Sequence, residues 1–196
     1  GVAAGIVGFA DLTLGDRVED VLAAMIEAGG GRLRGIRHSA GWHDDPVIGN
    51  NHHGAGPGLY LRGDFRAGLA RLTAMGLTLD ALVYHPQHGD LIDLARSCPD
   101  ATIIMNHTGM PLGYGPFTGR EREVRAQWQA TMPELAACPN VVMKLGGMMM
   151  RLAAFDYHTA PRPASSEQLA ACWRPYIEPC IEWFGARRCM FESNFP

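Results

Sequence analysis

The sequence predicts an α/β fold in which about six strand–helix units form most of a (β/α)8 barrel. Short apolar runs alternate with amphipathic stretches along all 196 residues, and repeats of this kind build a parallel sheet covered by helices. The predicted strands are apolar almost throughout, as parallel strands are when both faces are covered. Three of the connections that leave strands are long and polar, while those returning from helices are short. A barrel that works at the carboxyl ends of its strands has this asymmetry.

An open, doubly wound sheet is the alternative architecture for the same alternation. Such sheets commonly bind nucleotides through a glycine-rich motif that follows a strand. No GxGxxG follows the first predicted strand, and no GxxxxGK[ST] occurs in the sequence. The barrel is therefore favoured, and no nucleotide cofactor is expected.

Each element is predicted from its hydrophobic period and its end signals. The strands are predicted at about 2–10, 34–38, 79–85, 102–107, 141–145 and 189–194, and the helices at about 16–28, 64–75, 90–98, 119–137 and 165–184. Asp16 with Glu19, and Ser165 with Gln168, have the spacing of capping boxes. Pro133 is expected to interrupt the fourth helix, because proline removes a backbone donor and clashes with the preceding turn.

The bulk composition indicates one barrel domain over residues 1–196. The formal net charge is −3, which gives no electrostatic reason to expect nucleic acid or an anionic membrane as a partner. The longest apolar runs are far shorter than the ~20 residues that span a bilayer. Five cysteines without a CxxC pair indicate reduced thiols in a cytoplasmic protein. Because a whole barrel takes about 250 residues, we expect this domain to be truncated at both ends.

The histidines are the most informative residues, because all eight lie at predicted strand ends or in the loops that follow: His38, His43, His52, His53, His85, His88, His107 and His158. His38, His85 and His107 close strands, and in a parallel barrel such residues point toward a common mouth. An imidazole there can ligate a metal, hold a substrate oxygen or transfer a proton. A single such histidine would more often bond a neighbouring carbonyl, but three on one rim favour a functional role. His107 is the foremost candidate, whereas His52 and His53 are expected to be solvated loop residues.

Other polar residues also lie at or near strand ends. Lys144 occupies a strand otherwise made of Val, Met and Leu, and because an unpaired buried lysine is costly, it should meet a substrate carboxylate or a structural ion-pair partner. Arg37 and His38 are both candidate substrate ligands. Alternation turns them to opposite faces, and His38 is predicted to face the interior. Glu192 and Asn194 close the last strand, where a carboxylate or an amide can act as a base or position a water.

Two motifs resemble those of the amidohydrolase-related family of (β/α)8-barrel hydrolases: AsnHisThrGly at 106–109 and MetPheGluSerAsnPhePro at 190–196. That family includes lactonases of sugar acids and dicarboxylates, and decarboxylase relatives. The likeness covers essentially the whole chain and makes its strands the third to the eighth of the barrel. It implies that His85 matches the metal-ligand position of the fifth strand and that His107 is the sixth-strand histidine, with Zn or Mn as the divalent metal.

The chain departs from the family's pattern in two places. Members usually carry a His-x-His pair at the end of the first strand, and no such segment precedes Gly1. Asn194 stands where an aspartate is common, and a neutral amide cannot take a proton from water as a carboxylate does. Either another carboxylate, such as Glu192, takes over that role or the chemistry is altered.

The resemblance and the strand-end residues together predict hydrolysis of a small ester, foremost the lactone of a sugar acid or a dicarboxylic acid. His107 would stabilise the oxyanion or ligate a metal, and Lys144 or Arg37 would hold a substrate carboxylate. Two alternatives stay open: a barrel that binds a small carboxylic acid without turning it over, which Asn194 would explain, and a decarboxylase of the same superfamily. A small molecule is the expected partner, and association into a homo-oligomer is left open.

Overall fold

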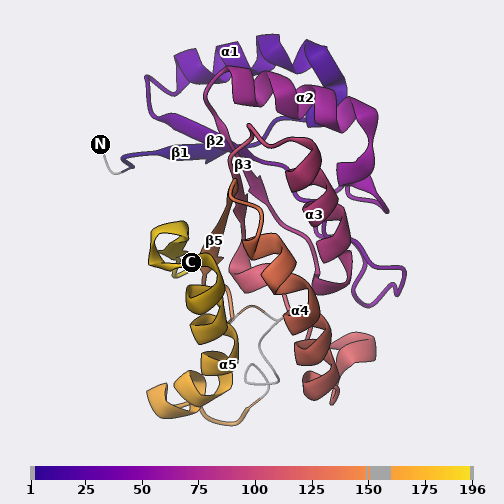
Figure 1. Cartoon of the computed structure of the whole chain (residues 1–196), viewed down its shortest axis with the longest axis vertical. Helices are drawn as coiled ribbons and strands as arrows, with labels where there is room; N and C mark the ends of the chain where they lie inside the picture. Colours follow the sequence, from indigo (N-terminus) through magenta and orange to yellow (C-terminus); the bar gives the residue numbers. More distant parts are fainter. Residues whose placement is uncertain (1–2, 149, 151–159, 195–196) are drawn as a thin grey trace.

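The computed structural model describes residues 3–148, 150 and 160–194. Its strands form one parallel sheet in which the spatial order follows the chain order. They are β1 (Ile6–Gly8), β2 (Leu33–Arg37), β3 (Thr78–Ala81), β4 (Ile103–Met105), β5 (Val141–Leu145) and β6 (Cys189–Phe191). The sheet curls into an open half-barrel (Figure 1).

The strictly sequential strand order decides between the two predicted architectures. Parallel crossovers are right-handed, so a sheet that adds each new strand on the same side carries every connecting helix on one face. A doubly wound sheet instead reverses its strand order at a switch point. The described strands show no such reversal. The incomplete barrel is therefore confirmed, and the doubly wound sheet is wrong.

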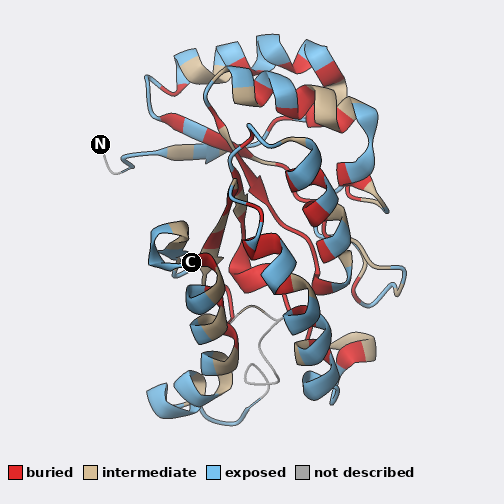
Figure 2. Ribbon diagram, viewed as in Figure 1, coloured by how far each residue is buried: buried red, intermediate tan, exposed pale blue. Residues whose placement is uncertain are grey.

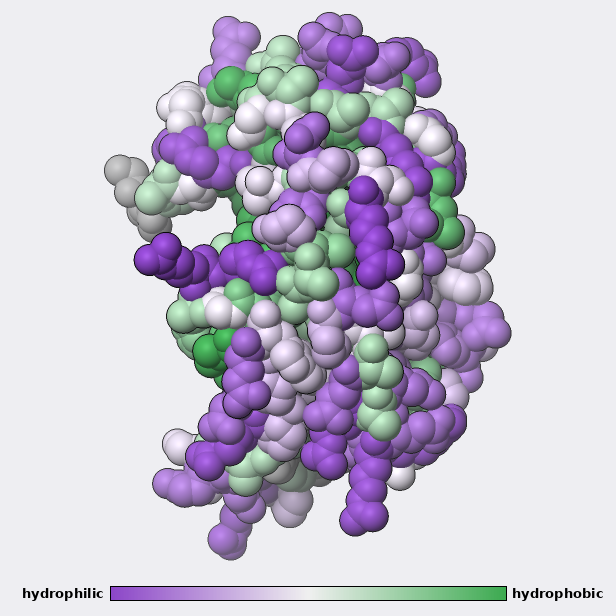
Figure 3. All heavy atoms as spheres, in the orientation of Figure 1, coloured by the Kyte–Doolittle hydropathy of each residue, from purple (hydrophilic) through white to green (hydrophobic). Residues whose placement is uncertain are grey.

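Helices cover the convex face of the sheet (Figure 1): α1 (Val18–Ala28), α2 (Gly63–Ala74), α3 (His88–Ser97), α4 (Glu121–Ala136) and α5 (Ser166–Phe184). The core lies between helices and strands, where Leu79, Ile103 and Val141 are fully buried. Figure 2 shows buried residues along the strands and exposed residues on the outer sides of the helices. The space-filling view of the same side is correspondingly hydrophilic over most of the helices (Figure 3). The concave face and the strand ends are thus left for a site.

The first helix begins differently from the prediction. Leu12–Arg17 already forms a 3₁₀ segment that the Asp11 side chain caps. Asp16 pairs with Arg71 of α2 at 2.8 Å instead of capping a helix. The predicted Asp16–Glu19 capping box is therefore wrong, because the 3₁₀ segment already begins at Leu12, four residues before Asp16.

The predicted capping box of α5 and the predicted interruption of α4 have opposite outcomes. The capping box of α5 is confirmed, with Gln168 N–H donating to Ser165 Oγ at 3.3 Å and Ser165 N–H donating to the Gln168 side chain at 2.8 Å. The predicted interruption at Pro133 is wrong, since α4 runs through it. Trp128 and Leu135, on either side of Pro133, are fully buried. That packing outweighs one lost helical hydrogen bond.

The three histidines predicted to close strands all lie beyond the observed strand ends, His38 by a single residue. β3 ends at Ala81 and β4 at Met105, because the register between neighbouring strands stops there. His85 and His107 each open a short 3₁₀ turn instead. Both turns still lie at the carboxyl ends of the strands, so the predicted location of the histidines holds while the predicted strand lengths do not.

The cysteines are free thiols, as predicted, with Cys138 and Cys180 buried and the other three partly buried. Among the described helices, none combines the length and the apolar character needed to cross a bilayer.

Candidate active site

The chain after β4 forms a left-handed turn at the mouth of the half-barrel. Four consecutive residues have positive φ: His107 at 54°, Thr108 at 53°, Gly109 at 72° and Met110 at 46°. Glycine adopts this conformation freely, but each other residue pays of the order of 1–3 kcal/mol for it. A run of this kind persists only where the surrounding structure holds it, and such turns cluster at functional sites.

Three buried side chains hold this turn, two of them by bonding to its backbone. Trp128 of α4 donates its Nε1–H to Thr108 O at 2.8 Å, and His88 of α3 contacts Gly109 O through Nε2 at 2.7 Å. The Thr108 hydroxyl both donates to Gly146 O and accepts from Gly146 N–H, each at 3.1 Å. These bonds come from two helices and from the loop after β5, so the turn is fixed from several sides.

The turn presents His107 to a carboxylate at the end of β6. Glu192 Oε1 lies 2.5 Å from His107 Nδ1 and accepts from the His107 backbone N–H at 3.0 Å. Burial alone would raise the pKa of Glu192, but the hydrogen bond and charge of His107, the charge of Lys144 and the backbone N–H together hold it below its usual range. An ionised carboxylate only accepts, so Nδ1 carries the proton and Nε2 keeps its lone pair when the ring is neutral.

Two glycines after β5 allow this pair to form. A Cβ on Gly146 would lie 2.1 Å from the Glu192 carbonyl oxygen, and one on Gly147 would lie 2.5 Å from His107 Nδ1. Gly147 also has a φ of 69°. Only residues without a side chain fit at these positions, so the loop after β5 packs directly against both members of the pair.

A second charged group lies on the concave face of the sheet. Leu79 and Met143 are buried in the core beside the helices, so their neighbours Asp80 and Lys144 turn to the opposite, concave side. Asp80 is fully buried, and its Oδ2 contacts both Lys144 Nζ and Arg37 Nη2, the latter at 3.4 Å. Of the two fates predicted for Lys144, the structure shows the ion pair.

His38 and Arg37 occupy the faces opposite to those predicted. His38 Nδ1 accepts from Leu12 N–H at 3.1 Å, and its ring lies 5.3 Å from that of Phe65 in α2. Burial lowers its pKa to about 4. The expectation that His38 faces the interior is wrong, because Arg37 turns to Asp80 instead. A role for either residue in binding substrate stays a prediction.

His85 has both ring nitrogens engaged within the chain. Its Nδ1 accepts from Leu112 N–H at 3.3 Å, and its Nε2 lies 3.2 Å from the Gln127 side-chain oxygen. Burial lowers its pKa to about 4, so the ring is neutral near pH 7. Of the loop histidines, His53 is exposed as predicted while His52 packs against Phe9. His158 lies outside the described residues.

The predicted metal ligands do not form a centre within the part of the chain that the structure describes. No group of three or more His, Cys, Asp or Glu side chains is placed there to hold an ion. His85 already uses both ring nitrogens, and His107 gives Nδ1 to Glu192, which leaves Nε2. The described residues therefore do not fit a metal on their own.

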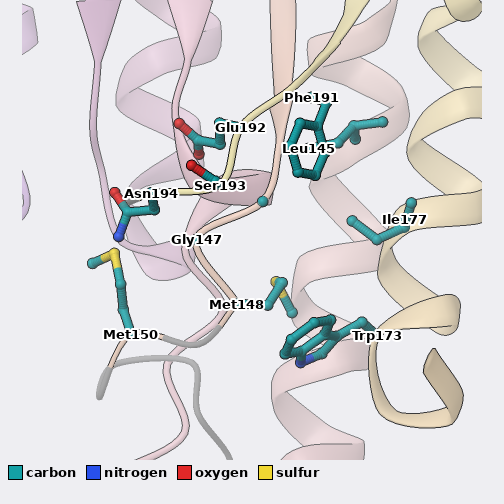
Figure 4. Close-up of a pocket in the computed structure, with 11 residues that line it drawn as sticks. Leu145, Gly147, Met148, Met150, Trp173, Ile177, Phe191, Glu192, Ser193 and Asn194 are labelled. Atoms are coloured by element: carbon teal, nitrogen blue, oxygen red, sulfur yellow. The ribbon is translucent and has the colours of Figure 1, made fainter. Parts of the chain in front are cut away.

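A cleft of about 770 Å³ opens between α5 and the ends of β5 and β6. Its wall is mostly apolar, with Leu145 and Phe191 from the strands and Trp173 from the helix, and its polar edge carries Glu192 and Asn194 (Figure 4). Glu192 thus borders the cleft and also binds His107. Asn194 lies on the same edge, with its amide directed toward neighbouring Met150 rather than toward Glu192.

Sequence reasoning missed Asp80 and Trp128, and it gave His88 only as one of the eight histidines at or after strand ends. Asp80 is a single carboxylate inside the apolar run LeuAspAlaLeuVal. Because an unpaired buried carboxylate is costly, its position in the sequence could have predicted a buried cationic partner. His88 and Trp128 hold the left-handed turn. They come from helices distant in sequence, and nothing in the local sequence pattern marks them as partners of that turn.

Comparisons with known proteins agree with this architecture. L-fucono-1,5-lactonase of Burkholderia multivorans is 28% identical, with 98% of this chain and 57% of that protein covered. An uncharacterized protein, y4mH, of Sinorhizobium fredii is 35% identical over 98% of this chain and 56% of its own length. The chain therefore spans a little over half the length of these relatives.

Solved structures and a family model extend the comparison. A crystal structure of an amidohydrolase from Burkholderia multivorans with bound zinc has a TM-score of 0.74 at 27% identity, covering 98% of this chain and 59% of that one. A probable 2-pyrone-4,6-dicarboxylic acid hydrolase from Acinetobacter baumannii, at 12% identity and a TM-score of 0.57, shares the fold. The family model described as Amidohydrolase matches residues 1–196. The chain belongs to the amidohydrolase family.

Proposed function

We propose that the chain carries the acid–base pair of a hydrolase that opens a small ester, foremost the lactone of a sugar acid or a dicarboxylic acid. The observation that carries this proposal is the double contact of Glu192 Oε1 with the Nδ1 and the backbone N–H of His107. A carboxylate that holds one ring nitrogen orients the other toward a reactant, as in hydrolases that use histidine as a general base.

In this proposal His107 Nε2 takes a proton from water while the water oxygen forms a bond to the lactone carbonyl carbon. The former carbonyl oxygen becomes negatively charged, and Lys144, whose charge already acts on Glu192, stabilises it. The ring C–O bond then breaks. His107 returns its proton to the departing alkoxide, and the product is the open hydroxy acid.

Asn194 enters the proposal as a water-positioning group rather than as a base. Its amide cannot take the proton, and it shares the polar edge of the cleft with Glu192. The carboxylate that the family commonly has at position 194 is thus replaced in function by Glu192, two residues earlier. This assignment favours an active hydrolase over a barrel that only binds its ligand.

A divalent metal is a separate question for the same site. One solved relative contains zinc, but the described residues of this chain do not fit a metal on their own, and the steps above use the chain's own groups. Metal analysis of the full-length protein, repeated after His107→Ala and His85→Ala, addresses this question. Zinc that is lost only in His107→Ala would identify His107 as a ligand whose partners lie outside the described residues.

Hydrolysis of a panel of sugar lactones and dicarboxylic lactones by the full-length protein tests the proposal. Glu192→Gln keeps the size of the side chain and removes its charge, so kcat should fall about 10²–10⁴-fold. Glu182→Gln is the matched control, because Glu182 is an exposed carboxylate on α5. A Glu192→Gln enzyme with the turnover of the control would contradict the proposed acid–base pair.

A further inference from the structure

Thr108 is the residue of the left-handed turn that is least suited to it. Its φ of 53° and ψ of 32° lie in the region that glycine favours, and a side chain branched at Cβ is an outlier there. It is also fully buried. Strained residues of this kind persist where the surrounding structure requires them, and they cluster at functional sites. The threonine side chain is therefore expected to make a contact that outweighs this strain.

His107 and Glu192 follow strands that are not neighbours in the sheet. Strand β5 lies between β4 and β6, and because adjacent strands are about 4.8 Å apart, β4 and β6 are separated by roughly twice that distance. The contact between Glu192 Oε1 and His107 Nδ1, at 2.5 Å, thus spans the end of β5. Gly146 and Gly147, which follow β5, pack directly against this pair. The position of this strand end therefore decides whether the carboxylate reaches the ring.

The Thr108 hydroxyl holds the end of β5 from the β4 side. It accepts from Gly146 N–H and donates to Gly146 O, each at 3.1 Å. On the other side, Leu145 O, which belongs to the same peptide unit as Gly146 N–H, accepts from Glu192 N–H at 3.1 Å. The N–H and C=O of a planar trans peptide point in opposite directions. One peptide unit is thus bonded both to the turn that carries His107 and to the residue that pairs with His107.

We propose that Thr108 is a positioning residue whose hydroxyl sets the separation of His107 and Glu192. It acts through the end of β5 rather than by contact with the reacting atoms. The inference rests on the proposed hydrolase function, in which this pair transfers the proton. The role requires a side-chain group that both donates and accepts. Serine has such a hydroxyl, whereas valine has only the branched shape of threonine.

The position of the proton on the neutral His107 ring tests the proposal without a substrate. In full-length protein labelled with ¹⁵N in histidine, the ring nitrogen shifts report which nitrogen carries the proton, and His107→Gln identifies the signal. In the wild-type protein the proton should lie on Nδ1, because Glu192 accepts it. In Thr108→Val it should be shared between Nδ1 and Nε2, because Glu192 is no longer held against the ring. Thr108→Ser should match the wild type.

The same variants should also differ in turnover. With a lactone that the wild-type protein hydrolyses, Thr108→Val should lower kcat about 10–100-fold with little change in KM, since small misplacements of reacting groups are that costly. Thr108→Ser should keep kcat within about 3-fold of the wild type, because serine retains both hydrogen bonds. Thr73→Val is the matched control, because the Thr73 hydroxyl also donates to a backbone carbonyl, Leu69 O at 2.8 Å, but lies on α2. It should leave the His107 proton and kcat unchanged.

A purely structural role for Thr108 gives a different result. The N–H and C=O of Gly146 lose a partner in Thr108→Val, so the midpoint of thermal unfolding should fall whichever role is correct. A lower midpoint combined with a wild-type His107 proton and a wild-type kcat, both measured well below that midpoint, would overturn the proposal. A serine variant as impaired as the valine variant would contradict it as well. If valine prevents folding, Thr108→Ala replaces it, and a wild-type His107 proton in the alanine variant would again count against the positioning role.

The two readouts keep a failure of the positioning role distinct from a failure of the proposed function. Lactone turnover that persists in Thr108→Val, with the proton still on Nδ1, would overturn the positioning role and leave the hydrolase standing. A shared proton in Thr108→Val, together with no turnover of any lactone by the wild-type protein, would support the positioning role and overturn the hydrolase. A wild-type His107 ring protonated on Nε2 would overturn both.

Discussion

Glu192 and His107 illustrate how one carboxylate sets the chemistry of a neighbouring histidine. The same carboxylate oxygen touches the ring and the backbone N–H of His107, so the ring is held in one tautomer and one orientation. Without the carboxylate, the ring of His107 can change both its tautomer and its orientation. For this reason we expect Glu192→Gln to lower kcat and to leave KM nearly unchanged. The substitution disturbs the proton transfer but leaves the substrate contacts in place.

His88, like His38 and His85, is a buried histidine whose protonation should lower stability in mild acid. Burial lowers its pKa from 6.5 to about 4. The unfolded chain therefore takes up this proton near pH 6.5 and the folded chain only near pH 4. Its contribution is complete above pH 6.5 and is lost as the pH falls toward 4, with a total on the order of 3 kcal/mol.

Urea unfolding between pH 7 and 4.5 checks this expectation. His88→Gln should lose less stability over that range than the wild-type protein, although it should start from a lower value at pH 7 because it disturbs the contact with Gly109. His53→Gln is the control, since His53 is exposed, and its pH dependence should equal that of the wild type. Identical pH slopes in all three proteins would contradict the assignment.

Asp80 should be the charged residue whose loss is most damaging to the fold. It is fully buried and compensates both Arg37 and Lys144, so Asp80→Asn leaves two cations without their partner. Breaking a buried pair from one side typically costs 3–5 kcal/mol, and we expect about that loss in the free energy of unfolding in urea. Asp93→Asn removes an exposed partner of Arg66 and should cost less than about 1 kcal/mol. Similar losses of unfolding free energy in the two variants would show that the buried ion pairs of Asp80 contribute no more to stability than an exposed one.

Among the elements, the left-handed turn at His107–Met110 shows how tertiary contacts overcome local preference. Three of its four residues are not glycine, so the isolated segment would not adopt this conformation. Bonds from α3, α4 and the loop after β5 hold it in place. The consequence is that His107 keeps its position only while those neighbouring elements keep theirs.

Gly147 provides a test of that dependence. Gly147→Ala introduces a Cβ at a φ of 69° and within 2.5 Å of the His107 ring. Gly76→Ala is a matched control, because Gly76 has a φ of 72° and open space around it. The control should lose only the backbone cost of about 1–2 kcal/mol. Gly147→Ala should lose more stability than the control and at least about 100-fold in kcat, since small misplacements of reacting groups are that costly. Equal stability and activity in the two variants would contradict the close packing.

At the scale of the whole molecule, the half-barrel leaves two sheet edges without a described neighbouring strand. Apolar side chains are exposed along both: Phe9 is 49% exposed near β1, and Phe191 is 84% exposed on β6. Exposed edges and apolar patches promote association between chains.

We therefore expect the 196-residue polypeptide to associate as its concentration rises, and Phe191→Asp to reduce that association. Sedimentation analysis over a range of concentrations measures the effect. Leu61→Asp is the control, because Leu61 is 46% exposed but lies outside the edge strands. Association that Leu61→Asp reduces as much as Phe191→Asp would show that the sheet edge is not responsible.

The sequence by itself determined the number and order of the strands and helices, the barrel class and the gathering of histidines at the carboxyl ends of the strands. These features follow from hydrophobic period and chain direction, which are local properties. Only the tertiary structure decided which polar residues meet: Glu192 with His107, Asp80 with Arg37 and Lys144. Those pairs join residues 43 to 85 positions apart. Their contacts depend on strand register and on the face to which each side chain turns, and a one-residue shift in either would separate them.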